Sequence, residues 1–269
     1  MEKILLLLAL IIIWSFSPVS GQEDQFKWPN GAKAAVCLTY DDGIATHLDI
    51  AIPDLDKEDL KGTFYLQGTN IFPDRVERWR QAAANGHELG NHTIFHPCSK
   101  NLDFVWEEFS TEKYTVRRMI RELEVMNHFL FSIDGLQHRS YAYTCGETEV
   151  GGTSFVDSLH NSGLFNGARG GMPVVVKNMR ELNLFEVPSL PVLDSNSGEL
   201  IPFVEEAGKA GGLAVFMFHG VGGDYLEVSR EGHYSLLQFL NENREQFWTA
   251  PFREVMQHIL NERKRLNWE

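Results

Sequence analysis

The sequence alternates between short apolar runs and longer amphipathic stretches from residue 34 onward. Short apolar runs of this kind predict buried strands. We expect strands at Ala34–Thr39, Gly62–Leu66, Glu88–Asn91, Arg139–Tyr143, Leu164–Ala168, Leu184–Val187 and Leu213–Phe218.

The stretches between these runs carry their apolar residues at helical spacing. We expect helices at Pro73–Ala84, Phe104–Phe131, Thr153–Asn161, Ile201–Ala210 and Tyr234–Asn243. Strands separated by helices imply βα units and a mainly parallel sheet, so the pattern predicts an α/β fold. The length of 269 residues suits a single domain of this class.

The first residues show a different pattern. Lys3 precedes an apolar run, Ile4–Trp14, and the small and polar residues Ser15–Gly21 follow it. These are the three parts of a secretory signal, so we expect residues 1–21 to be removed and the protein to be secreted or periplasmic. An uncleaved anchor is the alternative, but a membrane span needs about 20 apolar residues. We therefore expect no stable membrane insertion after cleavage.

Charge narrows the range of partners. The formal net charge is −13, which repels phosphate backbones and argues against nucleic acid as a partner.

Residues 22–32 are polar and end close to a Pro-Asn-Gly turn, which marks them as a lead-in segment. We expect one domain at 33–260 and a C-terminal tail at 261–269.

The chain has three cysteines, Cys37, Cys98 and Cys145. They are too few for a disulfide framework, and without a Cys-x-x-Cys pair they do not predict a structural zinc site. One disulfide together with one free thiol remains open for a protein outside the cytoplasm.

Two adjacent carboxylates, Asp41 and Asp42, follow the first predicted strand and precede Gly43. Two carboxylates in one small pocket raise a pKa unless a cation is present. A metal would allow one Asp to act as a ligand and the other as a free base. The alternative is a solvated Asp-Asp-Gly turn.

Two histidines, His92 and His96, follow the third predicted strand at a spacing of four residues. Side chains at this spacing can face one metal ion. The β-branched residues between them and the following Pro97 favour a loop over a helix. The pair lacks the Glu of a His-Glu-x-x-His helix, which disfavours a metalloprotease.

These polar groups, and His219 after the last predicted strand, lie where the carboxyl ends of parallel strands would gather. One carboxylate and two imidazoles leave a position for water, which is the arrangement of a catalytic zinc site. Co²⁺ or Ni²⁺ can use the same ligands.

Together the motifs resemble the polysaccharide deacetylase family, also known as the NodB-homology domain or carbohydrate esterase family 4. The family's Thr-Phe-Asp-Asp-Gly reads here as Thr39–Gly43 with Tyr in place of Phe, and its His-Ser/Thr-x-x-His as His92–His96. The resemblance implies a distorted (β/α)7-type barrel with Asp41 as general base. It also implies Asp42, His92 and His96 as metal ligands.

Two further motifs are less complete. The family's late motif with the general acid resembles the segment ending at His219, and the resemblance implies that role for His219. Its Arg-x-Pro-Tyr/Phe-Gly motif appears as Ala142–Gly146, so the oxyanion and substrate-binding roles fall on Tyr143 and the Cys145 backbone N–H. Because Arg is missing from that motif, Arg169 or Arg139 is expected to orient Asp41.

We therefore expect a hydrolase that removes N-acetyl, or alternatively O-acetyl, groups from a glycan. A non-catalytic carbohydrate-binding relative, an exported barrel with a structural metal and a small-molecule amidase are the alternatives. Chitin fragments, peptidoglycan and acetylated xylan remain open as substrates. Tyr225 could stack on a sugar ring, and His233 could approach the cleft.

Overall fold

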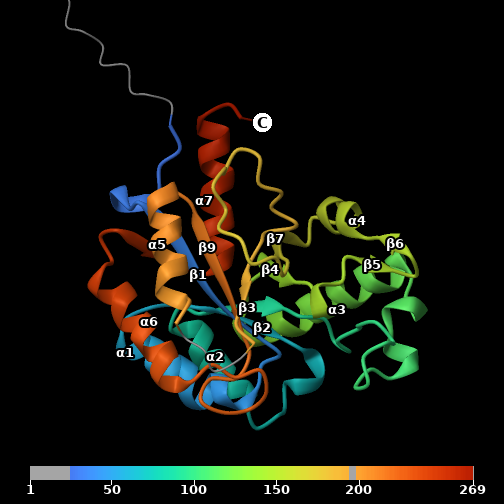
Figure 1. Ribbon diagram of the computed structural model, residues 1–269. Coiled ribbons are helices and arrows are strands. Elements are labelled where there is room, and N and C mark those ends of the chain that lie inside the picture. The colour runs from blue at the N-terminus through green and yellow to red at the C-terminus, as the bar shows by residue number, and fades with distance from the viewer. Residues whose placement is uncertain (1–24, 194–197, 269) are drawn as a thin grey trace, which may run out of the picture.

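The computed structural model describes residues 25–193 and 198–268, so the predicted signal peptide lies outside the described residues. Most strands form one parallel sheet in the order β7-β4-β3-β2-β1-β9-β8, with β10 also paired to β1 (Figure 1). Its strands are β1 (Ala34–Asp41), β2 (Thr63–Leu66), β3 (Glu88–Asn91), β4 (Arg139–Ala142), β7 (Phe165–Arg169), β8 (Leu190–Pro191), β9 (Leu213–Phe218) and β10 (Phe247–Thr249). The strands β5 (Glu149–Val150) and β6 (Thr153–Ser154) pair antiparallel in a separate small sheet.

The two edges of the large sheet are joined by one short segment. Val187 forms a bridge with Arg169 of β7, and Leu190 of β8 pairs with Phe216 of β9. The segment 187–191 therefore contacts both edges, and the sheet curls into a partly closed barrel. This confirms the expected distorted (β/α)7-type barrel.

Helices surround the sheet, and segments of one turn connect several elements (Figure 1). The α-helices are α1 (Ile52–Lys57), α2 (Val76–Ala84), α3 (Val116–Asp134), α4 (Val156–Asn161), α5 (Leu200–Ala210), α6 (Arg230–Glu242) and α7 (Phe252–Arg265). The short segments are η1 (Pro29–Gly31), the π-helix η2 (His47–Ala51), η3 (Gly68–Asn70), η4 (Glu107–Phe109), η5 (Thr111–Lys113) and η6 (Thr144–Gly146). Across the described ranges, every helix is too short or too polar to traverse a lipid bilayer.

The alternation of side chains along β1 decides what faces the barrel interior. Tyr40 and the other even-numbered residues pack into a cluster with α2, α5 and α6. Cys37 and Ala35 pack into a second cluster with residues of β4 and α7. Because successive side chains of a strand point to opposite faces, Asp41 shares the face of Cys37.

Three expectations about the elements need correction. The apolar run Leu184–Val187 is not a strand, since only Val187 forms a bridge. The helix predicted from Phe104 begins at Val116, where the Thr115 side chain accepts the Arg118 N–H and caps it. Residues 261–265, which were expected to belong to a C-terminal tail, are the last residues of α7, which ends at Arg265.

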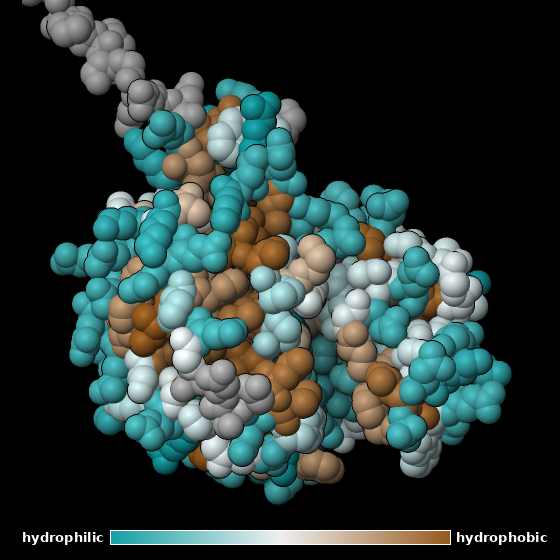
Figure 2. All heavy atoms as spheres, in the orientation of Figure 1, coloured by the Kyte–Doolittle hydropathy of each residue, from teal (hydrophilic) through white to brown (hydrophobic). Residues whose placement is uncertain are grey.

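The molecule has two parts of unequal size in this view. The space-filling view shows a hollow between the body of the barrel and the smaller lobe that carries β5 and β6 (Figure 2). Brown, apolar surface gathers along the barrel side of this hollow.

Candidate active site

The predicted polar residues meet at the carboxyl edge of the parallel sheet. Asp41 ends β1, His92 follows β3, Arg169 ends β7 and His219 follows β9. All four side chains are buried or nearly so, with 1–2% exposure for the first three and 13% for the His219 side chain. The sheet therefore brings residues from distant parts of the sequence into one buried polar site.

Asp42, His92 and His96 form the expected ligand cluster. Asp42 has a positive φ of 78°, which turns its carboxylate away from the alternation of β1. Its Oδ1 lies 3.4 Å from His92 Nε2 and 3.3 Å from His96 Nε2. The three ligand atoms lie within 4.8 Å of one another, close enough to share one metal ion.

The Asp42 carboxylate and the two imidazole nitrogens that face it are best stabilised by a positive charge between them. His92 Nδ1 lies 2.9 Å from the Ala142 carbonyl oxygen, so Nδ1 donates its hydrogen and Nε2 faces Asp42. Asp42 Oδ1 is buried and takes no hydrogen bond from the described residues. The cluster therefore fits a divalent metal, for which an imidazole nitrogen and a carboxylate oxygen are suitable ligands.

The pKa directions agree with this need for charge. Burial lowers the pKa of His92, but the carboxylates of Asp41 and Asp42 outweigh it and the net pKa is raised. Burial raises the pKa of Asp42, but its contacts with His92 and His96 outweigh it and hold that pKa well below the usual value. Both directions favour a positive charge beside the Asp42 carboxylate.

The loop that carries both histidines is held by α3. The Glu122 carboxylate accepts the N–H groups of Ile94 and Phe95, each at 3.0 Å. Thr93 and His96 have positive φ values of 64° and 53°, conformations that a helix does not contain. The two histidines therefore lie in a loop and not on a helix, as the sequence predicted.

Asp41 is held by one of its two oxygens. Arg169 Nη2 donates to Asp41 Oδ2 at 2.5 Å, and Arg169 Nη1 donates to Ser189 Oγ at 3.3 Å. Asp41 Oδ1 is buried and takes no hydrogen bond within the described residues. This arrangement orients the carboxylate and leaves one oxygen available for a proton.

His219 and Tyr225 line the other side of Asp42. His219 Nε2 lies 3.8 Å from Asp42 Oδ2, and burial lowers the pKa of His219. Its backbone oxygen accepts a hydrogen bond from His47 Nε2 at 2.8 Å. The Tyr225 hydroxyl donates to Asp42 Oδ2 at 2.7 Å, although the residue is 50% exposed. No pattern in the sequence indicates the His47 and Tyr225 contacts, because they join distant segments.

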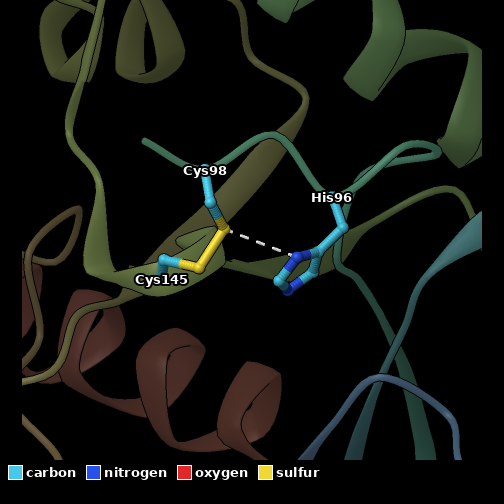
Figure 3. A group of neighbouring side chains, drawn as sticks. All are labelled: His96, Cys98 and Cys145. Atoms are coloured by element: carbon cyan, nitrogen blue, oxygen red, sulfur yellow. Dashed lines mark hydrogen bonds between the residues drawn. A yellow bond between two sulfur atoms is a disulfide. The ribbon is translucent and has the colours of Figure 1, made fainter. Parts of the chain in front are cut away.

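The middle motif is reinforced by a disulfide. Cys98 and Cys145 are bonded, and Cys37 is a buried free thiol, so the chain has one disulfide and one free thiol (Figure 3). Cys145 has a positive φ of 52° within η6. The Thr144 hydroxyl also donates to the Pro97 oxygen at 2.6 Å. The segment after β4 is thus tied directly to the loop of the metal-ligand cluster.

Three candidates have other contacts. Arg139 lies at the start of β4 and pairs with Asp134 at 3.1 Å, so we no longer consider it to orient Asp41. The Tyr143 side chain is 3% exposed and donates to the Phe185 oxygen, which removes it from substrate contact. His233 is buried 2.7 Å from the Tyr40 hydroxyl on the outer face of the barrel, and it does not approach the cleft.

Comparisons of sequence support the resemblance. A family model described as polysaccharide deacetylase matches residues 29–156. A peptidoglycan-N-acetylglucosamine deacetylase of Bacillus cereus is 44% identical over 68 residues, 24% of this chain and 24% of that protein. A chitin deacetylase of Colletotrichum lindemuthianum is 38% identical over 74 residues, 25% of this chain and 29% of that protein. The chain thus matches less than a third of the length of either relative.

Solved structures share the fold. A Mycobacterium smegmatis protein assigned to the polysaccharide deacetylases superposes with a TM-score of 0.65 at 15% identity, over 88% of this chain and 93% of that chain. A Bacillus anthracis protein described as a CE4 family pseudoenzyme gives 0.52 at 16% identity, over 83% and 65%. At these identities the likeness shows the fold alone. The sequence likeness to polysaccharide deacetylases extends over residues 29–156, just under half of the chain, and these residues contain the whole metal-ligand cluster.

Proposed function

We propose that this protein is a metal-dependent hydrolase that removes acetyl groups from a glycan, with Asp41 as base and His219 as acid. One observation carries the proposal. Asp42 Oδ1 faces two imidazole nitrogens at 3.4 and 3.3 Å, next to a second carboxylate with an unpaired oxygen. A turn of two solvated aspartates, the alternative at the level of sequence, would not bury both side chains.

Zn²⁺ suits the ligands Asp42, His92 and His96, with Co²⁺ or Ni²⁺ as alternatives. When bound, such an ion supplies Lewis acidity to the acetyl carbonyl and to the attacking water. Asp41 accepts the proton of that water at Oδ1, because Arg169 holds Oδ2. The Arg169 contact also fixes the direction from which this proton is taken.

The leaving group needs a proton as the acyl bond breaks. His219 lies beside Asp42, with Nε2 toward the site, and donates that proton to the departing amine or alcohol. The Cys145 backbone N–H is the proposed donor to the developing oxyanion. An amine leaves with more difficulty than an alcohol, so loss of His219 should affect amide substrates most.

The substrate class follows from the relatives. Two of them are named as deacetylases of peptidoglycan N-acetylglucosamine and of chitin, which supports an N-acetylated glycan as the substrate here. We also propose that residues 1–21 are a signal peptide that directs export of the protein. A disulfide next to the site supports it, because disulfides persist in oxidising compartments.

The test is acetate release from N-acetylated chitooligosaccharides, peptidoglycan fragments and acetylated xylan. We expect release by the zinc-loaded protein, loss with a chelator and recovery when zinc is returned. If the loaded protein releases acetate from none of these or from small acetyl esters, and still binds one of the glycans, the non-catalytic alternative is correct.

A further inference from the structure

The two ring nitrogens of His96 face different partners. Nε2 lies 3.3 Å from Asp42 Oδ1, in the metal-ligand cluster. Nδ1 lies 3.4 Å from Cys98 Sγ, as the dashed line in Figure 3 shows. The partner of Nδ1 matters because a neutral imidazole carries one hydrogen, and the partner of one nitrogen decides which nitrogen holds it.

Cys98 Sγ is bonded to Cys145, so it has no S–H group. A disulfide sulfur can accept a hydrogen bond but cannot donate one. The contact therefore favours the hydrogen on His96 Nδ1 and leaves the Nε2 lone pair toward the metal site. A free thiol at Cys98 could donate its S–H to Nδ1 and place the ring hydrogen on Nε2, where it blocks coordination.

We propose that the Cys98–Cys145 disulfide is a positioning element of the metal centre. The Cys98 sulfur sets the tautomer of His96, so that metal affinity depends on the oxidation state of this disulfide. This inference rests on the metal centre of the proposed function. His92 offers an internal comparison, because its Nδ1 partner is the Ala142 carbonyl oxygen, which no reductant alters.

The same two loops are also joined without the disulfide. Thr144 Oγ1 donates to the Pro97 oxygen at 2.6 Å and joins the loop of Cys145 to the loop of Cys98. The Thr111 N–H of η5 donates to the Cys98 oxygen at 2.9 Å and holds the loop of Cys98 separately. Both bonds remain after the disulfide is opened. The effect of the disulfide can therefore be separated from simple tethering by a variant that removes the Thr144 hydroxyl.

The disulfide can be reached from solvent through Cys145, which is exposed, whereas Cys98 is buried. A water-soluble phosphine opens it: the phosphine takes the oxygen of one water and becomes a phosphine oxide. The two sulfurs receive two electrons, and the two hydrogens of that water form two thiols. No other oxidant or reductant is required.

The first experiment measures zinc affinity by competition with a chromogenic chelator. We expect the folded double variant Cys98→Ala/Cys145→Ala to bind zinc about tenfold more weakly than the oxidised wild type, as for other groups that orient a metal ligand. The alanines also remove thiols that could bind zinc themselves. Thr144→Val, which loosens the loops but keeps the sulfur, should retain the wild-type affinity. Equal affinity of the double variant and the wild type, or an equal loss in Thr144→Val, overturns the inference.

The second experiment needs neither metal nor activity, and it serves even if the double variant does not fold. Nitrogen chemical shifts of the imidazoles report the tautomer in metal-free protein at a pH where the rings are neutral. We expect His96 to carry its hydrogen on Nδ1 in the oxidised wild type and to shift toward Nε2 after phosphine treatment, while His92 stays unchanged. An unchanged His96 tautomer overturns the inference. Absence of zinc binding to the oxidised wild type overturns the proposed metal centre instead.

Discussion

Two buried carboxylate sites lie at opposite ends of the same barrel. Glu88, at the start of β3, is 1% exposed and accepts hydrogen bonds at both oxygens. Its donors are the Thr63 hydroxyl, the Ser140 N–H and hydroxyl, and the Arg253 N–H, at 2.7–2.9 Å. At the other end, Asp41 and Asp42 are similarly buried, but each keeps one oxygen without a hydrogen bond among the described residues.

This difference separates a carboxylate whose partners all come from the protein from two carboxylates that can still take a ligand. Burying a carboxylate costs free energy unless donors replace the water that it loses. Glu88 regains these interactions from the protein itself and joins β2, β4 and α7. The two aspartates retain unpaired oxygens that a ligand can use. We therefore expect substitutions at one end to affect stability and substitutions at the other to affect chemistry.

The largest expected effect concerns the base. Asp41→Asn preserves the size of the side chain and an oxygen that Arg169 can contact, but it removes the proton acceptor. We expect kcat for acetate release to fall about 10³-fold with zinc affinity retained, since general base catalysis contributes on the order of 10²–10⁴-fold. Activity close to that of the wild type would show that Asp41 is structural, like Glu88.

The second prediction concerns the opposite end. Glu88→Ala leaves several buried donors without an acceptor, so we expect the free energy of unfolding in urea to fall by about 3 kcal/mol. The protein that remains folded should keep its zinc affinity, because Glu88 does not contact the metal-ligand cluster. A loss of zinc affinity without a loss of stability would contradict the division between the two ends.

Tyr40 and His233 form a third buried polar site, separate from the two carboxylate sites. His233 tests whether a buried ionisable group also lowers the free energy of unfolding at acidic pH. Burial lowers the pKa of His233 to about 4, the nearby Asp54 opposes this shift, and His47 and Arg230 add to it. Between about pH 6.5 and 4 the unfolded state therefore binds a proton that the folded state does not, and stability falls as the pH falls.

We expect this group to cost about 2 kcal/mol of unfolding free energy on going from about pH 7.5 to about pH 5. Urea unfolding of the wild type and His233→Gln at both pH values measures the effect. If both proteins lose the same amount of stability, His233 is not the group responsible.

The smallest expected effect concerns the second oxygen of Asp42. Tyr225→Phe removes the hydroxyl that donates to Asp42 Oδ2, and we expect zinc affinity to fall about fivefold, or about 1 kcal/mol. Tyr234→Phe is the matched control, because that hydroxyl donates to Glu58 outside the site. Equal zinc affinity in both variants would show that the Tyr225 contact does not orient Asp42.

Much of the fold and the central cluster could be predicted because their signals are local. β3 and β9 were predicted to the residue, and for β9 the reason is an uninterrupted apolar run that is read directly from the pattern. Asp42, His92 and His96 were predicted as neighbours because each lies at a strand end, and the ends of parallel strands meet at one edge.

The parts that could not be predicted depend on contacts between distant segments. Tyr225 meets Asp42 across 183 positions of the chain. Two arginines were candidates beside Asp41, with Arg169 preferred over Arg139, and the structure shows that Arg169 ends its strand while Arg139 begins one. The apolar run Leu184–Val187 resembles a strand, yet Leu184 and Phe185 lie in a turn, and the strand that pairs with β9 begins at Leu190.

The pairing of β1 has a consequence for the order of folding. Its first residues pair with β10 at Ala34–Phe247, and Ala35–Tyr40 pair with β9. β9 and β10, two neighbours of the strand that ends in Asp41, thus consist of residues made more than 170 positions later in synthesis. Contacts of such large sequence separation form slowly. The candidate active site therefore gains His219 only after most of the chain has been made, and a nascent chain that stops before residue 213 carries the first motif in a strand that can pair with β2 but not with β9.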